Sequence, residues 1–357
     1  KDTIATVTAS AAAGGVTTMV CLPNTTPPID DVSLIEFVAR RARETGLVKI
    51  YPYGSITRGC RGKELSELGI LAEAGALAFT DGNRAVADAQ VMRRAMSYAR
   101  TFDLMIVQHP EEPALVTDGA MNEGEIATRL GLPGIPPVAE VMMVERDLLL
   151  VALTGGRYHV GHISTAAAIE AVRRAKARGL RVTCDTAPHY FTLNETAVGD
   201  YRTFAKVSPP LRSEDDRVAV VEGLEDGTID AIASDHTPQD QESKRLPFAQ
   251  AEFGIAGVET LLPLSLALYH KGQLGLLDAL AKLTLRPAEI LGLNEGRLMK
   301  GAPADLVVFD LDRPWRIDPD ALRSKSKNSP FDGHPVQGRV NATVVGRRTV
   351  FERQTAA

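Results

Sequence analysis

The sequence predicts an α/β protein built as a (β/α)₈ barrel of the TIM type, followed by a small β-rich portion. Three observations lead to this expectation. Short apolar runs of strand length alternate with helix-length amphipathic segments over the first 295 residues. The apolar runs are nearly continuous, which is typical of strands buried on both faces of a parallel sheet. No Gly-x-Gly-x-x-Gly fingerprint occurs, so a barrel is favoured over a dinucleotide-binding sheet.

The helical segments between the expected strands end in glycine. Segments 31–46 and 164–179 place apolar residues on one face and close with glycine, a common helix C-cap. The chain has no initiating methionine and enters an Ala-rich helical segment at once, so we expect it to begin inside the barrel, with the first of eight strands missing. The seven strands expected are 17–23, 48–55, 76–81, 103–109, 157–164, 181–189 and 229–235.

The pattern changes near residue 296. Segments 296–317 and 338–352 are rich in strand-forming residues and separated by tight-turn signals. We therefore expect two units: a barrel over residues 1–295 and part of a small β-sandwich domain over residues 296–357.

Composition limits the class of protein. The 357 residues carry a net charge of −5, which argues against general affinity for nucleic acid or anionic membranes. No apolar run reaches the roughly 18 residues needed to span a bilayer. The three cysteines are too few and too scattered for a disulfide framework. A cytoplasmic enzyme is the expectation.

Metal-ligating residue types occur at the ends of four expected strands. They are Asp81, His109, His162 and Asp235. Any one of them alone is better explained as a hydrogen-bonded structural residue or a helix cap. Four together, at the barrel end where active sites gather, predict a site with imidazole and carboxylate ligands suited to Zn²⁺. His159 is three residues from His162, so a straight strand points the two to opposite faces, and only His162 is expected in the site.

Long stretches of the chain resemble class I dihydroorotases of the amidohydrolase superfamily. The resemblance covers nearly the whole sequence. The matching segments are 11–30 ("AAAGGVTTMVCLPNTTPPID"), 78–99, 109–116, 158–165 ("YHVGHIST"), 206–217 ("KVSPPLRSEDDR"), 229–240 ("IDAIASDHTPQD"), 253–263 and 296–310.

The resemblance implies a distorted TIM barrel that holds one or two zinc ions. The implied reaction is the reversible interconversion of N-carbamoyl-L-aspartate and L-dihydroorotate in de novo pyrimidine biosynthesis. His109 and His162 resemble the two histidines that hold one zinc, and Asp81 resembles a metal-bridging carboxylate. Asp235 resembles the strand-end aspartate that binds zinc and acts as general base.

The same resemblance implies the substrate contacts. Asn24 resembles a residue that binds a substrate carboxylate. The backbone of Phe253 and Gly254 resembles the loop that holds the dihydroorotate ring. Ser208 stands where the family usually has asparagine, and is expected to contact substrate from that position. A homo-oligomer is expected.

Departures from the family pattern leave two alternatives open. The family's H-x-H pair does not occur in this sequence, and "FTDGN" has one aspartate where two are usual. One alternative is therefore a non-catalytic dihydroorotase-like subunit that scaffolds aspartate transcarbamoylase. The other is a related hydantoinase or allantoinase, which is less favoured because such enzymes carry a carboxylated lysine where this chain has Asp81.

Overall fold

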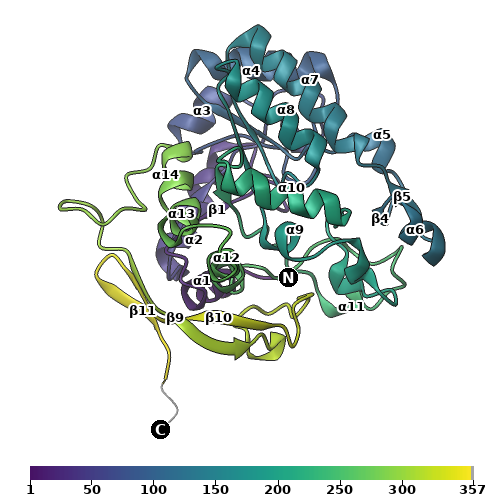
Figure 1. Cartoon of the computed structure of the whole chain (residues 1–357). Helices are drawn as coiled ribbons and strands as arrows, with labels where there is room; N and C mark the ends of the chain where they lie inside the picture. The colour runs from purple at the N-terminus through teal and green to yellow at the C-terminus, as the bar shows by residue number, and fades with distance from the viewer. Residues whose placement is uncertain (355–357) are drawn as a thin grey trace.

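The computed structural model describes residues 1–354 and contains a set of parallel strands in chain order (Figure 1). β1 pairs with β2, single bridges through Phe79 connect Gly54 and Ile106, and a four-stranded sheet has the order β3-β6-β7-β8. All seven expected strand positions therefore take part in parallel pairing, although 76–81 does so only through bridges of Phe79. The strands are β1 (Thr18–Cys21), β2 (Lys49–Pro52), β3 (Met105–Gln108), β4 (Met121–Asn122), β5 (Gly134–Ile135), β6 (Arg157–Val160), β7 (Val182–Thr186) and β8 (Ala231–Ile232).

Helices follow the strands and begin at residues that cap them. Asp31 accepts from Ser33 N at the start of α2, and Asp88 accepts from two backbone N–H groups at the start of α4, which satisfies donors that a helix leaves free. The helices are α1 (Ile4–Ala13), α2 (Val32–Thr45), α3 (Leu68–Glu73), α4 (Ala89–Thr101), α5 (Pro113–Val116), α6 (Glu125–Leu130), α7 (Val138–Thr154), α8 (Ala166–Ala177), α9 (Pro188–Thr192), α10 (Glu214–Glu225), α11 (Gln241–Lys244), α12 (Leu261–His270), α13 (Leu276–Leu283) and α14 (Leu285–Leu291).

The main core lies between the parallel strands and the surrounding helices. Phe79, Ile106 and Tyr158 are fully or almost fully buried in it. Near-continuous apolar strands are thus buried on both faces, as the sequence pattern predicts.

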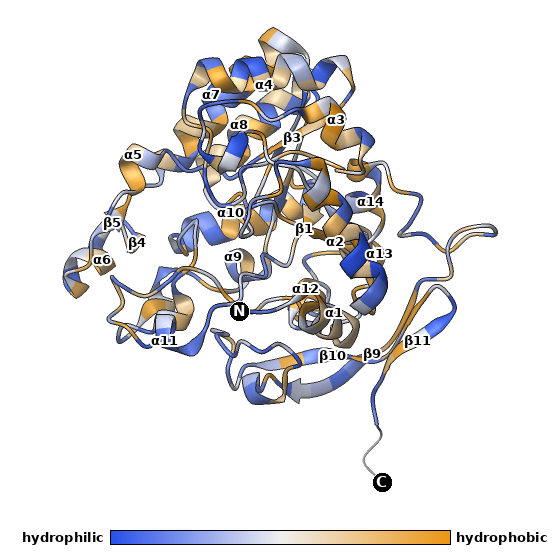
Figure 2. Cartoon of the chain, turned by 180° about the vertical axis from the view of Figure 1, so that it is seen from behind, coloured by the Kyte–Doolittle hydropathy of each residue, from blue (hydrophilic) through white to orange (hydrophobic). Residues whose placement is uncertain are grey.

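The C-terminal strands form a separate antiparallel sheet with the order β11-β10-β9. This sheet packs against α12 and α1 rather than standing apart (Figures 1 and 2). Leu262 and Leu266 of α12 form one apolar cluster with Val340 of β10. The strands of the sheet are β9 (Leu306–Arg316), β10 (Pro335–Val345) and β11 (Arg348–Glu352).

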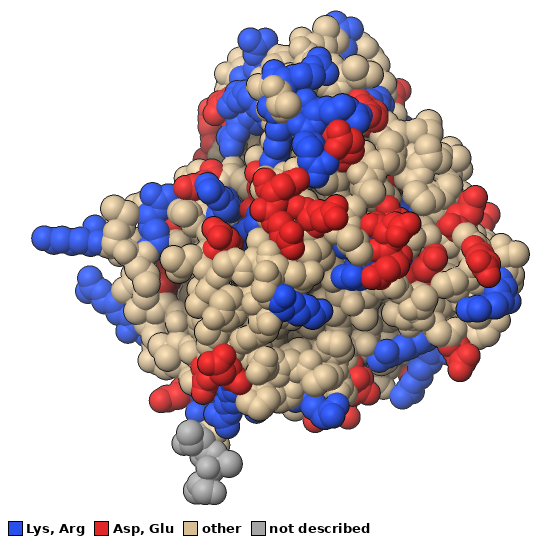
Figure 3. Space-filling view, viewed as in Figure 1, with Lys and Arg blue, Asp and Glu red and all other residues tan. Residues whose placement is uncertain are grey.

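Charged side chains are unevenly spread over one face of the molecule. Basic side chains gather at the top of Figure 3, over α4 and α8, and acidic side chains cross the middle, over α10. Within residues 1–354, every helix is too short or too polar to cross a membrane.

Candidate active site

The carboxyl ends of β3, β6 and β8 bring together three of the residues expected in the site. His109 directly follows β3, His162 lies two residues beyond β6, and Asp235 lies three residues beyond β8. The ring centroids of His109 and His162 are 6.1 Å apart. Burial opposes protonation of His162, but the charges of Asp235 and Asp185 outweigh it and raise its pKa to about 9.

The backbone at two of these residues is unusual. His162 has φ +55° and Asp235 has φ +42°, in the left-handed region that non-glycine residues rarely occupy. A hydrogen bond of 2.8 Å from His162 N to Asp185 Oδ1 holds the first of them. Such conformations persist only where the surroundings fix them, and they concentrate at functional sites.

Asp235 is half-buried, with 15% of its side chain exposed. Burial raises the pKa of its carboxyl group, while His162 and His109 lower it. Its Oδ2 is 3.4 Å from His189 Nε2. Burial lowers the pKa of His189 to about 3, so this ring is neutral at physiological pH. Asp235 thus has the surroundings of a carboxyl group prepared for proton transfer.

Asp81 has different partners from the other three expected ligands. It is 1% exposed, and its Oδ1 accepts from Thr57 N at 2.9 Å. Its Oδ2 accepts from Thr57 Oγ1. Both carboxylate oxygens are therefore engaged by Thr57, away from the pair of histidines.

The residues expected to bind substrate fall into two places. Asn24 is exposed and its Nδ2 donates to Asn83 Oδ1 at 3.2 Å. Ser208 is half-buried, and its Oγ lies 3.2 Å from His109 Nε2. Ser208 thus sits directly at the histidine pair, whereas Asn24 lies on the side of the site near Asp81 and Gly82.

The 253–254 dipeptide is fixed by hydrogen bonds to distant parts of the chain. Gly254 N donates to Lys206 O at 2.9 Å, and Gln239 Nε2 donates to Phe253 O at 2.7 Å. Asn328, from the polar loop before β10, donates to Gly254 O at 2.9 Å. The loop of residues 323–331 therefore reaches back to the barrel and holds a segment of the expected substrate site.

Two carboxylates of the site were not expected from the sequence. Glu111 is 4% exposed, and its Oε2 lies 2.9 Å from His109 Nε2. Burial would raise its pKa, but the hydrogen bond and charge of His109 lower it. Asp185 of β7 lies 2.9 Å from His159 Nε2 and 3.4 Å from His162 Nδ1. Each histidine of the expected pair thus has a buried carboxylate beside it.

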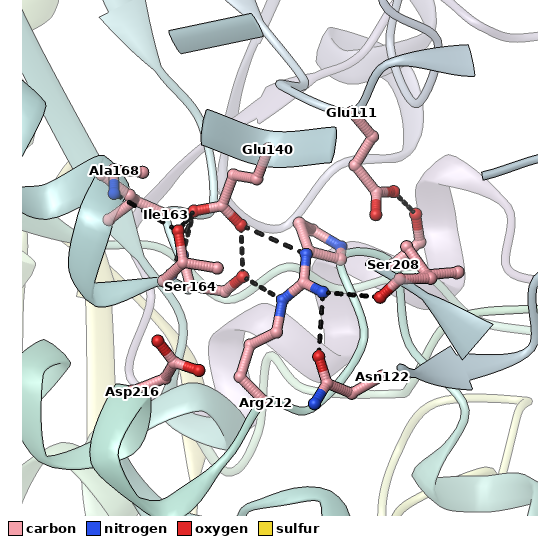
Figure 4. Close-up of polar contacts among 12 residues, drawn as sticks. Glu111, Asn122, Glu140, Ile163, Ser164, Ala168, Ser208, Arg212 and Asp216 are labelled. Atoms are coloured by element: carbon pink, nitrogen blue, oxygen red, sulfur yellow. Dashed lines mark hydrogen bonds and ion pairs between the residues drawn. The ribbon is translucent and has the colours of Figure 1, made fainter. Parts of the chain in front are cut away.

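A second polar network lies beside Glu111 and Ser208 (Figure 4). The guanidinium of Arg212 is buried and donates to Ser164 Oγ at 3.1 Å and Asn122 Oδ1 at 3.1 Å. Glu140, fully buried, accepts from the backbone and side chains of Ser164 and Thr165. The network joins β4 to the start of α8, so it fixes the outer wall of the site. Its members are spread over four segments of the sequence, so no local pattern predicts that they meet.

The donor types at the site fit a metal ion. Within residues 1–354, no group of three or more His, Cys, Asp or Glu side chains is already arranged as a coordination shell. Several buried polar atoms there nevertheless lack hydrogen-bond partners, namely Glu111 Oε1, His162 Nδ1 and both ring nitrogens of His189. Buried polar groups are nearly always paired, so these atoms indicate a missing cation, water or substrate. Imidazole and carboxylate are ligands that Zn²⁺ accepts.

Solved structures of hydantoinases and dihydropyrimidinases share this fold. The L-hydantoinase from Arthrobacter aurescens superposes with a TM-score of 0.89 at 27% identity, covering 99% of this chain and 81% of that one. The dihydropyrimidinase from Brevibacillus agri gives 0.84 at 22% identity, covering 98% and 80%, and supports the fold alone. The Amidohydrolase family profile matches residues 156–351. The chain is thus a TIM-barrel protein of the amidohydrolase class, as predicted.

Sequence relatives show to which family of the amidohydrolase class the chain belongs. The Dihydro-orotase-like profile matches residues 1–168. Dihydroorotases from Anaplasma phagocytophilum and Syntrophotalea carbinolica are 49% and 48% identical to this chain, which they cover to 99% and 98%, with 79% and 83% of their own lengths matched. The chain belongs to the dihydroorotase family. Proteins of this family are generally metal-dependent hydrolases.

Proposed function

We propose that this chain catalyses the reversible interconversion of N-carbamoyl-L-aspartate and L-dihydroorotate in pyrimidine biosynthesis. The observation that carries the proposal is the identity of 49% to a dihydroorotase across 99% of the chain. The chemistry of the group formed by the buried His109 and the half-buried His162 and Asp235 supports the same proposal. Neither the relatives nor the site gives support to a non-catalytic scaffold.

The proposed roles follow from position and burial. His109, His162 and Asp235 would hold a zinc ion, and bound zinc supplies Lewis-acid polarisation of the scissile amide. Asp235 accepts a proton from the attacking water and delivers it to the leaving nitrogen. The low exposure of the surrounding side chains excludes bulk water and strengthens electrostatic interactions. Asp81 stays in the proposed ligand set: Thr57 donates to both of its oxygens, and each carboxylate oxygen keeps a second lone pair for a metal.

The substrate contacts are proposed at Ser208, Asn24 and the 253–254 segment. Ser208 Oγ and the backbone of Phe253 and Gly254 would bind the ring, and Asn24 would bind a carboxylate. The hydrogen bonds that fix the 253–254 segment limit its movement, which favours a rigid fit to a small cyclic substrate.

The experiment is an ultraviolet assay of dihydroorotate hydrolysis by the full-length protein with its metal content determined. We expect turnover of dihydroorotate, and little or none of hydantoin or dihydrouracil. Metal-loaded, folded protein that leaves dihydroorotate intact would refute the proposal, and preferential turnover of hydantoin would favour the hydantoinase alternative.

Homo-oligomerisation, association with aspartate transcarbamoylase and a cytoplasmic location are further parts of the proposal. Gel filtration of the protein alone and mixed with that enzyme tests the first two.

A further inference from the structure

Glu111 connects two parts of the site through a single oxygen atom. Its Oε2 lies 2.9 Å from His109 Nε2 and accepts a hydrogen bond of 2.5 Å from Ser208 Oγ (Figure 4). Ser208 Oγ is itself 3.2 Å from His109 Nε2. The three side chains come from the loop after β3 and from the segment before α10, so the contact joins two elements that are 97 residues apart in sequence.

A carboxylate that accepts from one ring nitrogen of a histidine decides which nitrogen is left for a metal. Metal-binding histidines usually donate their other N–H group to such a carboxylate, which fixes both tautomer and ring orientation. At His162 the carboxylate of Asp185 lies 3.4 Å from Nδ1, at ion-pair distance and without a hydrogen bond to the ring. A carboxylate therefore lies beside each histidine, but only Glu111 is within hydrogen-bond distance of the metal-site imidazole next to it.

We propose that Glu111 is a positioning residue that holds His109 for the metal and Ser208 for the substrate at the same time. This inference rests on the proposed function. Glu111 is thus a further carboxylate at the site, beside Asp235 and Asp185. The remaining oxygen, Glu111 Oε1, is buried and has no partner, so the side chain can accept one further donor from water or substrate.

Glu111→Gln tests the proposal, with Glu112→Gln as the matched control. The amide keeps the shape of the side chain but loses its charge and one acceptor oxygen. Glu112 is the neighbouring residue and only caps α5 through Ala114 N, a bond that an amide oxygen can also accept. We expect metal affinity, measured by competition with a chelating dye, to fall about 10–100-fold in Glu111→Gln and to stay unchanged in Glu112→Gln. The KM for dihydroorotate should rise in the first variant only.

A third variant separates the effect of Glu111 on His109 and the metal from its effect on Ser208 and the substrate. Ser208→Ala should raise KM without changing metal affinity, and its effect on KM should not add to that of Glu111→Gln, because both remove one shared contact. In metal-free protein, the ¹⁵N shifts of the His109 ring should change in Glu111→Gln and not in the control. Wild-type metal affinity, KM and ring shifts in Glu111→Gln would overturn the proposal. A wild-type protein without dihydroorotate turnover would defeat the proposed function instead, while the affinity and shift measurements still decide the role of Glu111.

Discussion

Asp235 and His162 occupy left-handed backbone conformations just beyond the ends of β8 and β6, two strands of one sheet that are separated by β7. Aspartate tolerates this region better than most residues, because its short polar side chain can bond locally. Histidine there is held by the bond from its N–H group to Asp185. The strands thus end in turns that direct both side chains toward His109 rather than along the sheet. A sequence reader sees the residue types at these positions but not the turns.

The first prediction concerns Asp235→Asn. Asparagine also tolerates the left-handed region, so the backbone and fold should be kept. The amide cannot accept the proton from water, so kcat for dihydroorotate should fall by about 10²–10⁴-fold, with a smaller change in KM. Steady-state kinetics and a thermal melt measure this. Asp240→Asn is the control, since Asp240 only caps α11 through Ser243 N and asparagine caps equally well. Near-normal turnover in Asp235→Asn would remove Asp235 from the mechanism.

The second prediction concerns Gly254, where the backbone has φ +118°. A Cβ atom at this position would lie 2.6 Å from Thr237 O and 2.5 Å from Thr237 Cγ2. Gly254→Ala should therefore shift the 253–254 segment and raise KM for dihydroorotate. Gly179→Ala is the matched control, because Gly179 has φ +75° and open space around it. Both variants carry left-handed strain of about 1–2 kcal/mol, so only the difference between them reports the clash. Equal KM values in the two variants would show that the segment does not contact substrate.

At this scale, the sequence predicts a site residue only where that residue stands at the end of a strand. His109, His162 and Asp235 stand at strand ends, and parallel strands bring such ends to one edge. Glu111 stands in a turn two residues after His109, where no periodicity tells which way a side chain points. Asp81 also stands at a strand-end position, but no sequence pattern predicts that Thr57, 24 residues earlier, donates to its carboxylate.

At the scale of elements, the apolar runs predicted where the strands lie better than how long they are. β8 contains two residues where seven were expected, and the 76–81 run forms only bridges through Phe79. The conformation of the loop between β8 and α12 could not be predicted from local pattern. This loop is anchored by two buried lysines: Lys244 Nζ donates to Glu252 O at 2.6 Å, and Lys206 Nζ donates to Phe248 O at 2.9 Å. Lysine is almost never fully buried without a partner, so carbonyl acceptors far along the chain are needed to permit this arrangement.

The third prediction concerns the pH dependence that Lys244 gives to stability. Burial, with the nearby charge of Lys206, lowers the pKa of Lys244 to about 7, whereas an unfolded lysine titrates at about 10.4. Between these values the unfolded state binds more protons, so the free energy of unfolding gains a contribution that rises with pH. We expect urea unfolding of the wild type to show this rise from pH 7 to about 9, and Lys244→Met to reduce the slope. Lys63→Met, at an exposed lysine, is the control. An unchanged slope in Lys244→Met would mean that the buried lysine does not titrate in this range.

At the scale of the whole molecule, the barrel and the C-terminal sheet share a hydrophobic boundary. The side chain of Thr343 in β10 donates to Ala12 O at 2.7 Å, and Leu266 of α12 is fully buried against the sheet. The change in sequence pattern near residue 296 predicts a division into 1–295 and 296–357, but composition cannot show how much surface the two parts bury against each other. We propose that the division is one of topology and that the two parts unfold together.

The last prediction tests this coupling with Leu266→Ala. The chain has one tryptophan, Trp315 in β9, so its fluorescence reports the C-terminal sheet, while circular dichroism in the far ultraviolet reports mainly the helices of the barrel. Wild type should show the same unfolding midpoint by both signals. Loss of a buried leucine costs about 2–5 kcal/mol, and because the cluster belongs to both parts, both midpoints should fall together. Leu277→Ala, at a side chain 80% exposed, should move either midpoint little. If the tryptophan signal separated from the helical signal in any of the three proteins, the C-terminal sheet would be an independent folding unit, since coincident transitions are what a single cooperative unit requires.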